Sequence, residues 1–177
     1  MRKRLVWWEF SGFLWTAAVG SLLHFLYDWS GGSAVAAVLS AVNESVWEHM
    51  KLLVMAAAFF TAAQVWRLGR VYPNLPAVRG VSILAGALMI PLMYYTVTGA
   101  FRPQPTWVHI SIFFLAAAGM FLLDYRLLRT GLPRAEGMQL LGFLLLWGLL
   151  FVFVWCTFRP PEFPLWRDPV TGGYGVE

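Results

Sequence analysis

The sequence predicts an all-α integral membrane protein: a bundle of five transmembrane helices, plus a short re-entrant or interfacial helix and an extended, ordered C-terminal tail. Three observations support this fold class. The chain is 59% hydrophobic and only 12% charged over 177 residues, whereas soluble domains have about 25% charged residues. Five apolar stretches reach the roughly 20 residues that a helix needs to cross a bilayer. Basic residues cluster in alternate connections between these stretches.

The five stretches form one predicted transmembrane domain over residues 1–158, because no linker of the size of a soluble domain separates them. The expected spans lie at about 5–27, 45–66, 81–100, 106–125 and 138–158. The first stretch is longer than the apolar core of a signal peptide and contains Glu9, so we expect it to remain in the protein as a helix.

Two segments do not fit a simple span. Residues 33–42 form about 15 Å of helix, half a bilayer core, and fusing them to the second span would make that helix too long. We therefore expect a break near Asn43 and a separate re-entrant or interfacial helix. Residues 159–177 contain four prolines, which prevent a regular helix, but are too apolar for a disordered tail. This tail is expected to pack on the outer face of the bundle.

Lysines and arginines in short loops indicate the orientation. Nine of them fall on one side: Arg2, Lys3, Arg4, Arg67, Arg70, Arg79, Arg126, Arg129 and Arg134. That side is expected to be cytoplasmic, which predicts a multi-pass protein of the inner (cytoplasmic) membrane with its N-terminus inside and its C-terminus extracytoplasmic. Topology thus explains the net charge of +4 without a nucleic-acid partner. Membrane lipids are the expected partners, and homo-oligomerisation stays open.

Ionisable residues gather at the expected outer end of the bundle. The densest run is Asn43–Lys51, at the start of the second span. All three histidines of the chain, His24, His49 and His109, lie within about two helical turns of the same membrane face. Ionisable groups within spans are costly and usually mark function, so this cluster is the candidate site.

A metal site is the main hypothesis for the cluster. His24, His49 and His109 come from three helices, and Glu44 or Glu48 can add an oxygen ligand. Three nitrogens with a carboxylate or water suit zinc or another divalent first-row ion. An open coordination position would activate water, which predicts a metal-dependent hydrolase of a lipid or other amphiphile.

The expected catalytic residues are Glu44, Glu48 and Lys51. The acid that does not bind the metal would act as general base, and Lys51 or a tyrosine would stabilise developing charge. Asp28, Asn43 and Asp168 are expected to support the site.

Structural explanations compete with this hypothesis, and whether the chain is an enzyme stays open. Ser45 and Glu48 match a capping box at a helix start, and Glu44, Glu48 and Lys51 can neutralise one another. Asp124, near the opposite face, can pair with Arg126 or Arg129. Two other functions remain: a small transporter or ion- or proton-handling protein that uses Glu44, Glu48 and Lys51, and a non-enzymatic membrane scaffold or accessory subunit.

Two motifs carry a family resemblance. Asn43–Lys51 (pattern NESxWEHxK), following His24–Gly31, together with the tail Pro160–Gly175 (pattern PPxxPLxxDPxTGxYG), resembles an uncharacterised family of small, clostridia-like bacterial multi-span membrane proteins. The resemblance covers nearly the whole chain and implies no known activity. A looser analogy is with membrane zinc hydrolases of the alkaline ceramidase type, which have histidines and an aspartate near one membrane face, although the order and spacing here differ and the helix count is lower.

Overall fold

A computed structural model describes residues 2–101, 105–131 and 135–176, and within these ranges the chain is all-helical. The helices are α1 (Arg2–Trp29), α2 (Ala34–Leu39), α3 (Val46–Leu68), α4 (Leu75–Ala100), α5 (Thr106–Thr130) and α6 (Glu136–Phe158). All except α2 are long and apolar enough to cross a membrane. The predicted all-helical fold class is therefore confirmed, with five helices able to span a membrane and one short helix.

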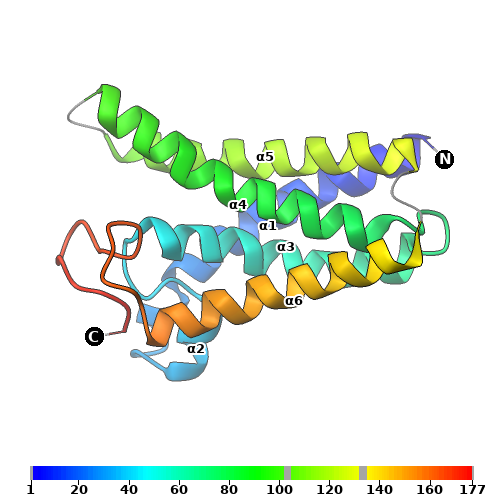
Figure 1. Cartoon of the computed structure of the whole chain (residues 1–177). Coiled ribbons are helices and arrows are strands. Elements are labelled where there is room, and N and C mark those ends of the chain that lie inside the picture. The colour runs from blue at the N-terminus through cyan, green and yellow to red at the C-terminus, as the bar shows by residue number, and fades with distance from the viewer. Residues whose placement is uncertain (1, 102–104, 132–134, 177) are drawn as a thin grey trace.

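The long helices run side by side, and the C-terminal tail lies across one end of the bundle (Figure 1). We call this the tail end. There α1, α4 and α6 finish, α3 and α5 begin, and the short α2 packs. The opposite end, where α1 begins, is the basic end. The cytoplasmic orientation of the basic end stays a prediction.

The fourth helix begins earlier than the sequence predicted, at Leu75 instead of Val81. Pro76 lies in its first turn, where proline fits because the first helical N–H groups have no partner within the helix. Arg79, expected in a loop with the other basic residues, is consequently inside α4 and fully buried. That expectation was wrong.

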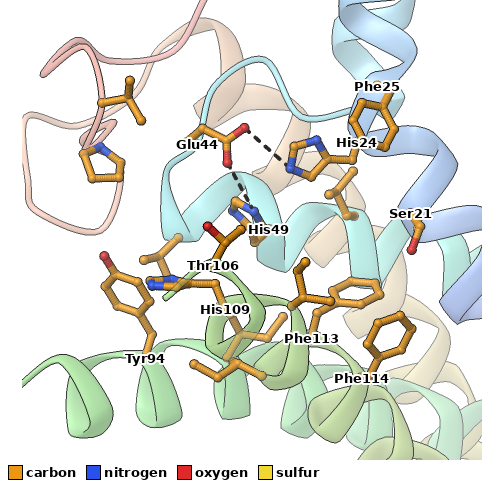
Figure 2. A pocket seen from close by; sticks show the side chains of 18 residues that line it. Ser21, His24, Phe25, Glu44, His49, Tyr94, Thr106, His109, Phe113 and Phe114 are labelled. Carbon is orange, nitrogen blue, oxygen red and sulfur yellow. Dashed lines mark ion pairs between the residues drawn. The ribbon is translucent and has the colours of Figure 1, made fainter. Parts of the chain in front are cut away.

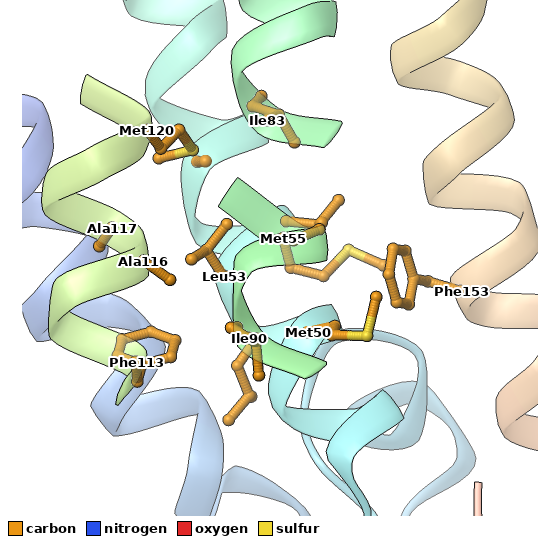
Figure 3. Close-up of a cluster of buried hydrophobic side chains, with 14 of the residues drawn as sticks. Met50, Leu53, Met55, Ile83, Ile90, Phe113, Ala116, Ala117, Met120 and Phe153 are labelled. Carbon is orange, nitrogen blue, oxygen red and sulfur yellow. The ribbon is translucent and has the colours of Figure 1, made fainter. Parts of the chain in front are cut away.

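The core lies around α3, which is the most buried of the five long helices. Leu53 of α3 faces Ala116 and Ala117 of α5, Ile83 of α4 packs alongside, and Phe153 closes the α6 side (Figure 3). Small residues let helix backbones approach closely, which favours helix association in a membrane.

The tail packs on the start of α3 and the end of α6. The backbone N–H of Trp47 donates to the Leu165 carbonyl (3.1 Å), and the backbone N–H of Val176 donates to the Thr157 carbonyl (3.3 Å). The Trp47 and Trp166 rings lie 4.7 Å apart. Arg167 and Tyr174 form an isolated antiparallel bridge, so the tail is an ordered segment that folds back on itself.

Candidate metal site

Three side chains converge at the tail end. His24 comes from the last turns of α1, Glu44 from the loop before α3, and His49 from the first turn of α3. Each offers a ligand atom, and these three atoms all lie within 4.8 Å of one another. His24 Nε2 is 3.5 Å from Glu44 Oε1, and His49 Nε2 is 3.7 Å from Glu44 Oε2 (Figure 2).

Local sequence explains how α3 presents His49. Ser45 is the N-cap of α3, and its hydroxyl accepts a hydrogen bond from the Glu48 N–H (3.3 Å), as half of the predicted capping box requires. The Ser45 carbonyl lies 2.9 Å from His49 Nδ1. Since a carbonyl only accepts, Nδ1 carries the proton and Nε2 keeps its lone pair. Metal-binding histidines usually have this arrangement, with the second ring nitrogen bonded to a carbonyl or carboxylate.

The two His–Glu distances are long for hydrogen bonds and close to the spacing of ligands around a metal ion. The two His–Glu separations exceed the N–H···O optimum of about 2.9 Å. They are close to about 3.4 Å, the spacing of two ligands on a tetrahedral ion with bonds of about 2.1 Å. The widest separation among the three ligand atoms is up to 4.8 Å, so the atoms must draw together to bind one ion.

Glu44 is charged in this setting. A long hydrogen bond from His24 holds the pKa of the Glu44 carboxyl below its usual value, partial burial opposes this shift, and attraction to both imidazoles adds to it. Its side chain is 46% exposed. A carboxylate, not a carboxylic acid, therefore faces the two imidazoles, as metal binding requires.

The group opens on a cavity of about 680 Å³ with a mostly apolar wall. Four long helices and the tail line it. Its members include Phe25 of α1, Leu52 of α3, Ile90 of α4, Phe113 of α5 and Val170 of the tail. The ligand atoms therefore lie where polar and apolar surfaces meet.

His109 lines the same cavity but is not one of the three converging residues. It lies in the first turn of α5, and its ring centroid is 5.3 Å from that of Tyr94 (Figure 2). The structure thus brings together two of the three predicted histidines, with Glu44 as the third member. The sequence predicted the end of the bundle at which His109 lies, but not the direction in which its side chain points.

Glu48 and Lys51 occupy a different, buried place. They form an ion pair with each other, and Thr157 Oγ1 lies 2.7 Å from Lys51 Nζ and 3.1 Å from Glu48 Oε1. Lys51 also donates to the Ala37 carbonyl and Glu48 accepts from the Val42 N–H. Neither is among the residues that line the cavity. The pair joins α2, α3 and α6 and fixes the loop that carries Glu44.

The predicted supporting residues have separate positions. The Asn43 side chain donates to the Gly175 carbonyl (3.0 Å) and accepts from the Ser45 N–H (3.0 Å), which ties the tail to the α3 start. Asp168 shapes a turn of the tail by accepting from the Val170 N–H (2.8 Å). Asp28 is exposed at the end of α1, one turn beyond His24.

Sequence reasoning missed a second buried polar group, towards the basic end. Arg79 Nη1 is 2.8 Å from Asp124 Oδ2, and both side chains are fully buried. The expected pairing of Asp124 with Arg126 or Arg129 was therefore wrong. Pro76, as a helix-start signal, would have placed Arg79 inside α4, but nothing in the sequence identifies Asp124 as its partner.

Comparison with known proteins agrees with this picture without adding an activity. A family of unknown function, DUF6512, matches residues 2–176. The chain belongs to this family. No curated protein and no solved structure matches the chain. The DUF6512 protein is thus a multi-spanning helical protein whose function must be argued from its site.

Proposed function

We propose that this DUF6512 protein binds one divalent metal ion, most simply zinc, through His24, Glu44 and His49. The observation that carries the proposal is the convergence of three ligand atoms within 4.8 Å at the wall of a cavity. Two imidazoles and a carboxylate are a common ligand set of catalytic zinc. The Nδ1 bond of His49 to the Ser45 carbonyl orients one ligand in advance.

The chemistry that fits this site is hydrolysis of a lipid or other amphiphile. A zinc ion held by His24, Glu44 and His49 would keep a position open for water and would make that water easier to deprotonate. The apolar wall suits an acyl chain, whereas the polar ligands face its head. Tyr94 and His109 line the same cavity and supply groups that can move a proton or stabilise charge on the reacting head.

Metal content tests the binding proposal. Protein purified in detergent and analysed by mass spectrometry is expected to hold about one equivalent of metal per chain, as three ligands around one ion imply. His49→Ala and Glu44→Gln should lose it. His109→Ala is the matched control, because His109 lines the cavity without belonging to the three, and should keep the metal.

Two results would contradict the assignment. If wild-type protein contains no metal and added zinc does not raise its Tm, the group only holds the tail end together, as a scaffold would. If His109→Ala loses metal as completely as His49→Ala, the three-ligand set is wrong. Hydrolysis is tested separately: the metal-loaded protein should cleave a long-chain p-nitrophenyl ester, and His49→Ala should not. Absence of cleavage by a loaded protein would leave metal binding without hydrolysis.

A further inference from the structure

The second buried polar group carries an inference independent of the metal site. It lies between α1, α3, α4 and α5, where Arg79 donates to three acceptors: Asp124 Oδ2 (2.8 Å), Thr61 Oγ1 (2.9 Å) and the Ala57 carbonyl (3.2 Å). An arginine in a protein is always charged. Arg79 and Asp124 alone would therefore be a neutral, well-bonded pair.

Glu9 of α1 upsets this balance, because it adds a second carboxyl group. It is 5% exposed, and its Oε1 accepts from the Gln64 side chain (3.1 Å). Its second oxygen, Oε2, and Asp124 Oδ1 are both buried without a hydrogen-bond partner among the described residues. The charged neighbours of Glu9 are Asp124 and Arg79, so the two carboxyl groups belong to the same buried group. If both were ionised, two negative charges would face one positive charge inside the bundle.

A single positive charge resolves both the unbonded oxygens and the charge excess. Two carboxylates side by side cannot both ionise easily, and such pairs share a proton. A hard metal cation is the other candidate, but calcium takes 6–8 oxygen ligands and magnesium requires an octahedral set. Among the described residues this group offers only three unbonded oxygens, those of Glu9, Gln64 and Asp124.

We propose that Glu9 and Asp124 form a proton-binding site, in which Glu9 holds a proton at neutral pH and uses it to donate a hydrogen bond to Asp124 Oδ1. We assign the proton to Glu9 because the Arg79 guanidinium donates directly to Asp124. Glu9 receives only a neutral amide hydrogen from Gln64. The charged groups that act on Glu9 are Asp124 of α5 and Arg79 of α4, whereas α3 contributes the uncharged Gln64 and Thr61.

The site joins four helices through one exchangeable proton. When Glu9 releases it, an uncompensated charge appears between α1 and α5, and the hydrogen bond that links these helices is lost. Loading and release of the proton therefore change how α1 packs on the bundle. This position is distinct from the metal-site residues at the tail end, which belong to other turns of α1 and α3.

Infrared spectroscopy detects such a proton directly, since a carboxylic acid has a C=O stretching band separate from those of carboxylates and amides. The wild-type protein in detergent at neutral pH should show this band, and Glu9→Gln should lose it. Glu162→Gln, which changes an exposed glutamate of the tail, is the matched control and should keep the band. Labelling all glutamates with ¹³C should lower the wavenumber of the wild-type band, which assigns it to a glutamate without any substitution.

Thermal unfolding gives an independent readout. The Tm of the wild-type protein should fall at high pH, when Glu9 loses its proton. Glutamine resembles a protonated glutamate and can still donate to Asp124. Glu9→Gln should therefore have the wild-type Tm at neutral pH and should not show the fall at high pH. Asp124→Asn removes the direct ion-pair partner of Arg79 and should lower the Tm by about 10 °C. The proposal is overturned if wild-type protein has no acid band at neutral pH, if the band survives in Glu9→Gln, or if sodium removes it at constant pH.

Discussion

The contact between α4 and α6 makes a quantitative prediction, because it is built on a glycine. A Cβ atom added to Gly142 would lie 2.3 Å from Ala77 Cα and 2.5 Å from the Pro76 carbonyl oxygen. Both obstacles are backbone atoms, so no side chain can move aside. To bring the shorter contact to 3.0 Å, the two helices must separate locally by about 0.7 Å.

The cost of Gly142→Ala follows from this separation. A gap of about 0.5–1 Å removes a quarter to a half of the dispersion attraction between facing atoms, and overpacking costs about 1–3 kcal/mol. Alanine regains about 0.5–1 kcal/mol of helix propensity. The free energy of unfolding should fall by about 1 kcal/mol, which corresponds to a Tm lowered by about 2–4 °C.

Thermal unfolding in detergent, followed by circular dichroism, measures this effect. Gly148→Ala is the matched control in the same helix, because a Cβ there meets no atom within 4 Å. Its Tm should equal or slightly exceed that of the wild type. If Gly142→Ala and Gly148→Ala unfold within about 1 °C of each other, close approach of the α4 and α6 backbones does not stabilise the bundle.

Two further predictions concern the tail end. Thr157→Val removes the hydroxyl 2.7 Å from Lys51 Nζ. It should lower the free energy of unfolding by about 2 kcal/mol, since hydrogen bonds to charged groups contribute about 1.5–3 kcal/mol. Thr96→Val, at an exposed position, is the control, and equal Tm values for the two variants would contradict the role of the Thr157 hydroxyl. The pKa of Glu44 is lowered, first by its hydrogen bond from His24. In metal-free protein the Glu44 carboxylate should therefore contribute fully to the free energy of unfolding above the ordinary glutamate pKa of 4.5. This contribution should be lost as the pH falls through the lowered pKa. The Tm of Glu44→Gln should therefore decline less on acidification than that of the wild type, and parallel declines would show that Glu44 has no such partner.

Hydropathy predicted the spans because a helix that faces lipid must be apolar over its length. The same criterion failed at the start of α4. Arg79 interrupts an apolar window, so the sequence placed it in the loop, although the structure buries it inside the helix. A hydropathy profile counts a charge against a span whether or not a partner such as Asp124 compensates it.

The candidate site was predicted in part, for a comparable reason. The position of each residue within its predicted span correctly placed His24, Glu44 and His49 at one end of the bundle. It does not give the rotation of each helix about its own axis, which decides which side chains meet. His109 consequently lies beside Tyr94. Glu48 points towards α6, where the Thr157 hydroxyl donates a hydrogen bond to it. That contact joins residues 109 positions apart, beyond the reach of local pattern reasoning.

The two buried ion pairs also set an order for assembly during synthesis. Lys51 and Glu48 lie three residues apart in one helix, so α3 enters the membrane with its charges already matched. Arg79 precedes Asp124 by 45 residues, and a lone arginine inside an isolated span costs about 2.5–3.5 kcal/mol. Its guanidinium therefore stays in the headgroup region, close to the start of α4, until the ribosome has delivered α5. We expect the basic end of the bundle to close only after α5 is inserted, so that α4 and α5 enter the membrane as one unit.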